Sequence, residues 1–210
     1  MEPCKRRKKR KHTESQKEDK GGFREKYKEG VDLYYTDNGS AYINPHEVFM
    51  KPVLKDIIDS WIKPLYPEQD LSPITVFDLA CGSGEAALVF QEAGAKHITG
   101  CDPYTFEAFT KRTGLPVRKD TFLDISKGSL GLTKTYDVIV CSYALHLAPV
   151  SLMSQLCLSM ALVAEYLFIV SPHKFPLMRE EYGWELLHDT TVTRVHCRLF
   201  KSKLLATNYS

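Results

Sequence analysis

The sequence of 210 residues lacks the features that mark disulfide-stabilised, zinc-binding or membrane-spanning proteins. Its six cysteines are scattered and form no Cys-x-x-Cys pair, which argues against a disulfide framework and against a metal site. No apolar run reaches the roughly 18 residues that a membrane-spanning helix needs, and the N-terminus begins with charged residues. We therefore expect a protein that is neither secreted nor membrane-bound and that keeps its thiols reduced.

Basic residues are concentrated at the N-terminus. Residues 1–20 contain nine Lys or Arg and four Asp or Glu, whereas the rest of the chain contains 19 and 22. Residues 1–22 lack aromatic side chains and are predicted to form a disordered basic tail. Seven consecutive residues make up its basic block: Lys5, Arg6, Arg7, Lys8, Lys9, Arg10 and Lys11.

This basic block favours two roles over that of a solvated tail without a partner. It is typical of a nuclear localisation signal and of an arm that binds RNA phosphates. We expect the protein in the nucleus, the nucleolus included, with the cytoplasm as the alternative. The sequence does not identify a protein partner.

Residues 23–73 are expected to form an N-terminal helical or lid segment. Asn44, with Pro45 after it and Glu47 three residues later, predicts an N-cap and the start of a helix. Pro52 is expected to kink or restart that helix.

Beyond residue 73, short apolar runs alternate with amphipathic segments. Strands are predicted at 74–80, 97–101, 115–119, 136–141 and 166–171, with helices at 85–93, 104–112 and 149–164. Two further strands, at 184–191 and 194–205, should form a hairpin. The predicted fold is α/β: a doubly wound, mostly parallel seven-stranded sheet with an antiparallel C-terminal strand.

The turn after the first predicted strand has the residues of a nucleotide-binding loop. Gly82 and Gly84 allow the backbone to approach a ligand closely, and Asp102 after the next strand can accept ribose hydroxyls. Residues 82–87 also fit the GxGxxG/A pattern of NAD- and FAD-binding proteins. Against that alternative, no Tyr-x-x-x-Lys pair occurs, and the Asp78 carboxylate would stand where a pyrophosphate should lie.

The run DxxCGxGE from Asp78 to Glu85, with Asp102 and the strand run at 136–146, resembles the class I S-adenosylmethionine-dependent methyltransferases. The resemblance covers residues 74–172 and implies a Rossmann-like domain over 74–210 with S-adenosyl-L-methionine as cofactor. The cofactor-binding positions that it implies are Asp78, Ala80, Cys81, Gly82, Ser83, Gly84, Asp102, Pro103, Cys141 and Ser142.

The adenine-binding position follows the third predicted strand. Asp120, Phe122 and Asp124 all lie near it, and the register leaves them open. We prefer Asp120 as acceptor for the adenine amine and Phe122 as the side chain that covers the ring.

Methyl transfer needs an in-line approach more than it needs a nucleophile, so a base matters only if the acceptor must lose a proton. His173 after the fifth strand is the preferred catalytic candidate, with Tyr143, His146 and Lys174 as others. Tyr42 and His46 could cover the same cavity. We expect no metal, and we interpret the thiols of Cys81, Cys101 and Cys141 as small apolar filler.

The possible methyl acceptor is narrowed mainly by motifs that the sequence lacks. The chain lacks the Asn/Asp-Pro-Pro turn of exocyclic-amine methyltransferases, the Asp of 2′-hydroxyl enzymes and the Pro-Cys of cytosine-C5 enzymes. One hypothesis is a nuclear methyltransferase of RNA or a ribonucleoprotein. Alternatives are a methyltransferase of a small molecule or protein side chain, an NAD-dependent oxidoreductase and a non-catalytic scaffold.

Overall fold

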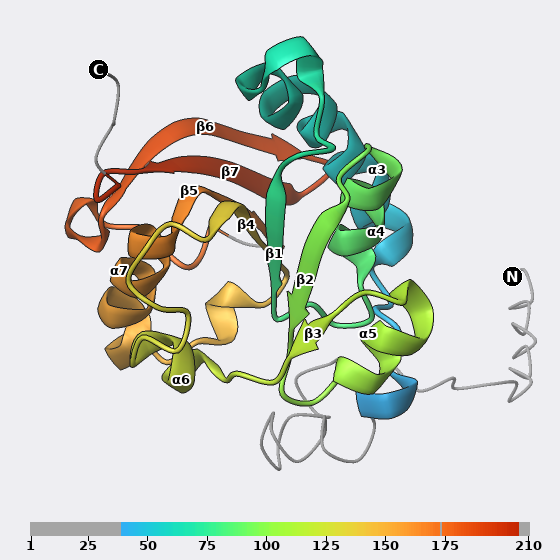
Figure 1. The fold of residues 1–210 in the computed structure, drawn as a ribbon, viewed down its shortest axis with the longest axis horizontal. Coiled ribbons are helices and arrows are strands. Elements are labelled where there is room, and N and C mark those ends of the chain that lie inside the picture. Colours follow the sequence, from blue (N-terminus) through green and yellow to red (C-terminus); the bar gives the residue numbers. More distant parts are fainter. Residues whose placement is uncertain (1–38, 173, 206–210) are drawn as a thin grey trace, which may run out of the picture.

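The structure, a computed structural model, describes residues 39–172 and 174–205 (Figure 1). The predicted basic tail and His173 therefore lie outside the described residues. Within the described ranges, no helix combines the length and the apolar character needed to cross a bilayer.

A seven-stranded sheet forms the centre of the molecule, as predicted. Its order is β3-β2-β1-β4-β5-β7-β6, and β7 runs antiparallel to both of its neighbours. The strands are β1 (Thr75–Leu79), β2 (His97–Cys101), β3 (Val117–Arg118), β4 (Tyr136–Ser142), β5 (Ala164–Ser171), β6 (Trp184–Val192) and β7 (Val195–Ser202). Strands β1, β4 and β5 are apolar on both faces because helices cover the sheet on both sides.

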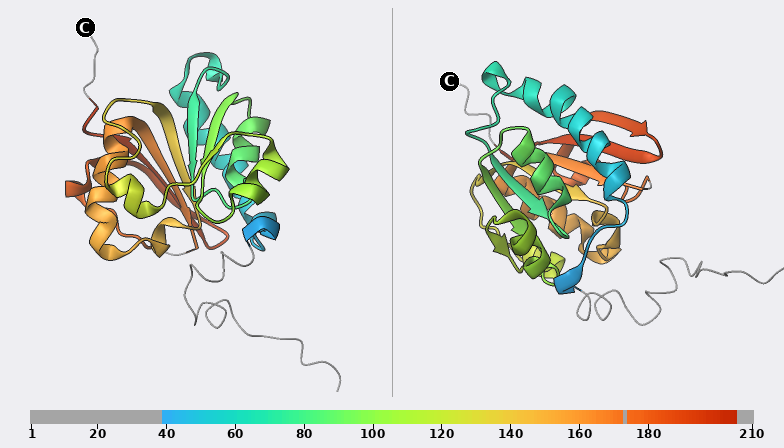
Figure 2. Two further views of the ribbon diagram at one scale, coloured as in Figure 1. Left: turned by 60° about the horizontal axis from the view of Figure 1, so that its bottom comes forward. Right: turned by 90° about the vertical axis from the view of Figure 1, so that its right-hand side faces the viewer.

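Two helical layers enclose this sheet (Figure 2). One layer contains α3 (Glu47–Ile57), α4 (Glu85–Glu92) and α5 (Phe106–Thr113), and the other contains α6 (Phe122–Ser126) and α7 (Met153–Val163). Neighbouring strand residues alternate between the two cores: Val76 packs in the first and Phe77 in the second. Shorter helical turns connect them: η1 (Gly39–Ala41), η2 (Ile58–Ile62), η3 (Lys63–Leu65), η4 (Pro67–Gln69), η5 (Leu145–Leu147), η6 (Val150–Leu152) and η7 (Glu180–Tyr182).

The start of the first described α-helix differs from the prediction. Helix α3 begins at Glu47, and His46 is its N-cap residue. Asn44 does not cap it, because the Asn44 Oδ1 accepts a local bond from the His46 N–H at 2.9 Å. Pro52 does not restart the helix, which continues to Ile57. Pro52 has no backbone N–H to donate to the carbonyl of Val48. The Val48 side chain is exposed, so water can hydrate that turn.

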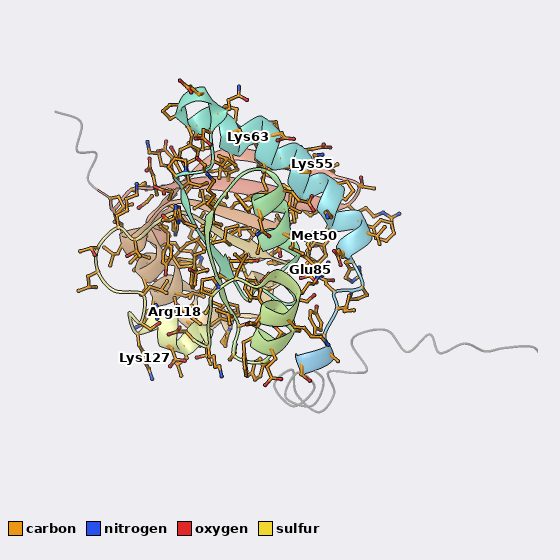
Figure 3. All side chains as sticks on the ribbon, turned by 45° about the vertical axis from the view of Figure 1, so that its right-hand side comes forward. Met50, Lys55, Lys63, Glu85, Arg118 and Lys127 are labelled. Carbon is orange, nitrogen blue, oxygen red and sulfur yellow. The ribbon has the colours of Figure 1, made fainter. Side chains whose placement is uncertain are left out.

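Helices α3 and α4 lie side by side on the sheet (Figure 3, in which Met50 and Glu85 are labelled). Met50, Leu54 and Ile58 are fully buried in the same apolar cluster as Phe90 of α4. This packing fixes the N-terminal end of α3 beside the turn that follows β1, where the cavity described below begins.

Gly100 is expected to be intolerant of a side chain. A Cβ there would lie 2.5 Å from the ring of Phe109, a fully buried residue of α5. Gly100→Ala should therefore lower the free energy of unfolding by about 1–3 kcal/mol, measured by denaturant titration. If the close contact is the cause, the same substitution should cost much less in a Phe109→Leu background; an equal cost in both backgrounds would contradict this explanation.

Candidate functional site

A cavity of about 510 Å³ lies at the carboxyl ends of the central parallel strands. It is bordered by the segments that follow β1, β2, β3 and β4, where the strand order reverses between β1 and β4. Open α/β sheets bind ligands at this kind of switch point. Its volume is that of a small-molecule site.

The turn after β1 borders the cavity and contains left-handed backbone, a conformation that favours glycine. Gly82 has φ 55°, and a Cβ on it would lie 3.1 Å from Glu85 Oε2 and 3.2 Å from the Tyr42 ring. Ala80 has φ 53° although it carries a Cβ. Left-handed backbone at a non-glycine residue costs free energy and occurs most often at functional sites.

Asp78 lies behind this turn and does not border the cavity. Its side chain is fully buried; Oδ2 accepts a bond from the Ala87 N–H at 3.0 Å, and Oδ1 has no hydrogen-bond partner. Burial raises the pKa of the Asp78 carboxyl well above its usual value, and the nearby Glu85 and Asp102 raise it further. Burial therefore favours the neutral form of this acid.

Asp102 follows β2 and borders the cavity. Its Oδ1 accepts bonds from the backbone N–H groups of Tyr104 and Thr105, both at 2.9 Å. The described residues place no hydrogen bond on Oδ2, so this oxygen is available to a ligand.

The three candidates for the adenine-binding position lie in the segment after β3. Asp120 and Phe122 border the cavity, whereas Asp124 forms a capping box with Thr121 at the start of α6. Asp120 also forms a two-bond ion pair with Arg118, at 2.7 and 3.2 Å, which lowers the pKa of the Asp120 carboxyl.

The end of β4 forms the wall opposite Asp102. Ser142, Tyr143 and Ala144 border the cavity, and Tyr143 has φ 58°. The ring of His46 stacks on Tyr143 with their centroids 5.6 Å apart. Burial raises the pKa of the Tyr143 hydroxyl, which favours a hydrogen-bond donor over a general base.

Eight of the twelve predicted cofactor residues border this cavity. They are Ala80, Cys81, Gly82, Asp102, Pro103, Asp120, Phe122 and Ser142. The other four, Asp78, Ser83, Gly84 and Cys141, belong to the same strand ends but do not border it.

The catalytic candidates, unlike most of the cofactor residues, do not gather at the cavity. Of these, Tyr143 borders the cavity; His146 is partly buried in η5 and does not border it, and Lys174 is exposed. His173 lies outside the described residues.

Several lining residues were missed by sequence reasoning. Most follow a predicted strand or lie before α3, and Glu85 was part of the quoted motif without a role. They are Asn44, Leu79, Glu85, Tyr104, Thr105, Thr121, Leu123, Ala144, Leu147, Pro149 and Leu152. The signal in the sequence that could have identified most of these residues as cavity-lining is their position directly after a predicted strand.

The cavity has an acidic lining. Three carboxylates border it, from Glu85, Asp102 and Asp120, and no Lys, Arg or His among the described residues does so. Arg118 offsets the charge of Asp120 from outside the lining. Arg112 pairs in the same way with Glu85, so Asp102 is the lining carboxylate for which the described residues supply no ion pair.

The cysteines near the cavity are unsuited to metal binding or nucleophilic chemistry. Cys81, Cys101 and Cys141 are buried free thiols, and burial raises the pKa of each, that of Cys101 to about 12. Across residues 39–172 and 174–205, no three His, Cys, Asp or Glu side chains gather as a metal site would require.

Comparisons with known proteins agree with this architecture. No family model matches the chain. An uncharacterized protein of Schizosaccharomyces pombe is 29% identical, with 87% of this chain and 93% of that protein aligned.

Solved structures with similar folds include two methyltransferases. The magnesium protoporphyrin IX methyltransferase of Synechocystis PCC 6803, solved with bound SAM and with bound SAH, has a TM-score of 0.52 at 18% identity; with SAM, 85% of this chain and 93% of that chain are covered. The ribosomal protein L11 methylase of Lactobacillus delbrueckii has a TM-score of 0.54 at 15% identity, covering 77% and 81%. The chain thus has the class I methyltransferase fold, which confirms the predicted fold class.

Replacing Asp78 should reveal its raised pKa through the pH dependence of stability. A carboxyl whose folded-state pKa is raised gives its full stabilisation below its unfolded pKa near 3.8 and loses it as the pH rises. An asparagine side chain at this position would stay neutral and could still accept from the Ala87 N–H. The melting temperature of Asp78→Asn relative to the parent should therefore increase from about pH 4 to 8. A difference that stays constant over this range would mean that Asp78 ionises normally.

Proposed function

We propose that this chain is an S-adenosylmethionine-dependent methyltransferase whose cofactor lies in the cavity at the ends of β1–β4. The observation that carries the proposal is a cavity of about 510 Å³ with three carboxylates and no basic residue among its described lining. S-adenosylmethionine is a nucleoside with a sulfonium and an ammonium group, and it supplies an activated methyl group when bound. An acidic cavity suits both cations.

Named residues fit the parts of this cofactor. Asp102 Oδ2 is free to accept ribose hydroxyls, because both backbone bonds fall on Oδ1. Phe122 and Leu123 offer apolar surface to the adenine ring, and Asp120 is the nearby acceptor for its amine. The turn at Gly82 leaves room for the methionine part, because a Cβ there would crowd Glu85 and Tyr42.

The same electrostatics count against the dinucleotide alternative. An NAD or FAD pyrophosphate carries two negative charges and normally rests on a helix N-terminus or a cation. Here the cavity beside the N-terminus of α4 contains Glu85, and Asp78 is buried behind the turn. A pyrophosphate at this position would face the Glu85 carboxylate, whose partner Arg112 does not line the cavity.

For the acceptor, we propose RNA or a ribonucleoprotein in the nucleus. The support is the basic block at residues 5–11, whose density of charge is suited to phosphates. The alternative is a small molecule or protein side chain, which is favoured by the apolar residues after β4 that border the cavity: Ala144, Leu147, Pro149 and Leu152. A scaffold that binds the cofactor without catalysis is the third possibility.

The residues at the end of β4 are suited to orienting an acceptor. Tyr143, with its raised pKa, can donate a hydrogen bond to an acceptor group and exclude water from it. The stacked His46 ring holds Tyr143 from the side of α3. His173 stays our proposed base for an acceptor that must lose a proton.

Calorimetry should detect S-adenosylmethionine and its demethylated product, S-adenosylhomocysteine, with dissociation constants on the order of micromolar. Asp102→Asn keeps an oxygen for Tyr104 and Thr105 but presents an amide N–H₂ where ribose hydroxyls need an acceptor. It should weaken binding about tenfold to a hundredfold. The exposed Asp56→Asn serves as the charge-matched control and should bind like the parent. Heat with NAD but none with either sulfur compound would reverse the assignment.

The basic tail should determine RNA affinity if RNA is the acceptor. Replacing residues 5–11 by Gln should weaken RNA binding, and the slope of log affinity against log salt should fall by about 0.7 per lost phosphate contact. A control that keeps the block and replaces residues 12–22 by Gly and Ser should behave like the parent. An unchanged salt slope, together with methylation of a small acceptor, would favour the alternative.

A further inference from the structure

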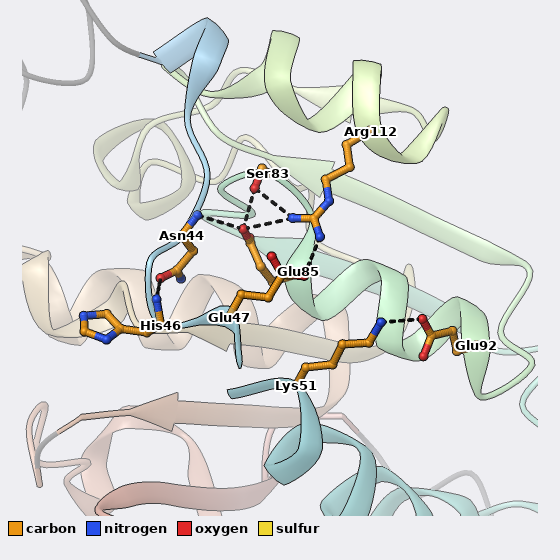
Figure 4. Close-up of polar contacts among 8 residues, drawn as sticks. All are labelled: Asn44, His46, Glu47, Lys51, Ser83, Glu85, Glu92 and Arg112. Carbon is orange, nitrogen blue, oxygen red and sulfur yellow. Dashed lines mark hydrogen bonds and ion pairs between the residues drawn. The ribbon is translucent and has the colours of Figure 1, made fainter. Parts of the chain in front are cut away.

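Glu85, the first residue of α4, is a buried carboxylate that receives three hydrogen bonds on one oxygen. Its residue exposure is 3%. Oε1 accepts from the Ser83 hydroxyl, from the Asn44 backbone N–H at 3.2 Å and from Arg112 Nη1 at 3.4 Å (Figure 4). The three donors come from the turn after β1, from the segment before α3 and from α5.

The second oxygen of Glu85 is turned toward the cavity. Oε2 lies 3.1 Å from the position of a Cβ on Gly82, and both residues line the cavity. Among the described residues Oε2 takes part in no hydrogen bond or ion pair. Unlike Asp78 Oδ1, Glu85 Oε2 is not among the buried oxygens that lack a partner, so a cation in the cavity can reach it and pair with it.

The bonds of Glu85 also hold the segment that covers this part of the cavity. We call residues 42–47 the strap. The strap is fastened twice: Asn44 donates to Glu85, and Glu47 forms an ion pair with Arg112, which also contacts Glu85 and Ser83. Tyr42 and Asn44 themselves line the cavity, and Figure 4 shows the contacts of Asn44 and Glu47.

From this arrangement we infer that Glu85 Oε2 anchors the α-ammonium group of the cofactor, and that this anchoring fastens the strap over the bound cofactor. The inference rests on the proposed function. A cation at Oε2 holds the carboxylate in the orientation in which Oε1 receives Asn44 and Arg112. Because ligand and strap then favour the same orientation, each stabilises the other, and the coupling is reciprocal.

Two ligands separate this role from a purely structural one. S-adenosylhomocysteine carries the α-ammonium group, whereas 5′-methylthioadenosine has the same nucleoside and thioether without it. In calorimetry with the full chain, Glu85→Gln should weaken S-adenosylhomocysteine about tenfold to a hundredfold and change 5′-methylthioadenosine less than about threefold. Equal weakening of both ligands, or of neither, would overturn the inference.

The matched control is Glu92→Gln, on the same helix. Glu92 is exposed at the far end of α4 and pairs with Lys51 at 2.6 Å (Figure 4). This variant should bind both ligands like the parent. If the parent chain binds neither ligand, the proposed function fails; if it binds both and Glu85→Gln does not discriminate between them, the inference alone fails.

Hydrogen exchange tests the fastening of the strap directly. S-adenosylhomocysteine should slow amide exchange in a peptide covering residues 42–50 of the parent and of Glu92→Gln, and much less so in Glu85→Gln. Equal protection in all three chains would contradict the coupling. If Glu85→Gln does not fold, an analogue of S-adenosylhomocysteine with hydrogen in place of the α-amine gives the same test on the parent: weakening of about tenfold or more supports the inference, and unchanged affinity overturns it.

Discussion

The left-handed turn that follows β1 positions the neighbouring elements that line the cavity. The Cys81 N–H donates to the Cys101 carbonyl at the end of β2, and the Gly84 N–H closes the turn on the Cys81 carbonyl. Gly84 also lets α4 and α5 approach, because a Cβ on it would lie 2.4 Å from Thr113 Cγ2. The turn thus joins the ends of two strands and starts the helix on which Glu85 is the first residue. A side chain at these glycines would separate elements that the site requires together.

Carboxyl groups that lie close together repel one another when ionised, and the protein reduces this repulsion in two ways. Burial raises the pKa of the Asp78 carboxyl and so favours its neutral form, whereas Asp120 is paired with Arg118 and Glu85 with Arg112. Both arginines approach from outside the cavity lining, so they lower the repulsion without supplying a basic group to the ligand. The described lining of the cavity thus contains carboxylates and no basic side chain, even though each carboxyl group is individually accommodated. Sites that are arranged for a ligand before it binds often give up some stability in this way.

The sequence predicts the sheet well because its central strands are buried on both faces and appear as short apolar runs. β1, β2 and β4 begin and end within about one residue of their predicted limits, whereas β3, predicted over 115–119, is paired only at Val117 and Arg118. The start of α3 was wrong because a local bond between Asn44 and His46 competes with capping. The role of Glu85 could not be seen either: its partner Asn44 is 41 residues away, and which oxygen faces the cavity is a tertiary property.

The acidic cavity and the basic tail impose different demands on an acceptor. If the acceptor is RNA, its phosphates find no cation among the described residues that line the cavity, and Glu85, Asp102 and Asp120 would repel them. The phosphates must then be bound outside, where the basic block at residues 5–11 offers the densest positive charge in the chain. A group that enters beside Tyr143 must therefore not be an anion, and it meets the apolar residues that follow β4. Affinity and site selection would consequently depend on separate parts of the molecule, one sensitive to salt and the other to the shape of the cavity.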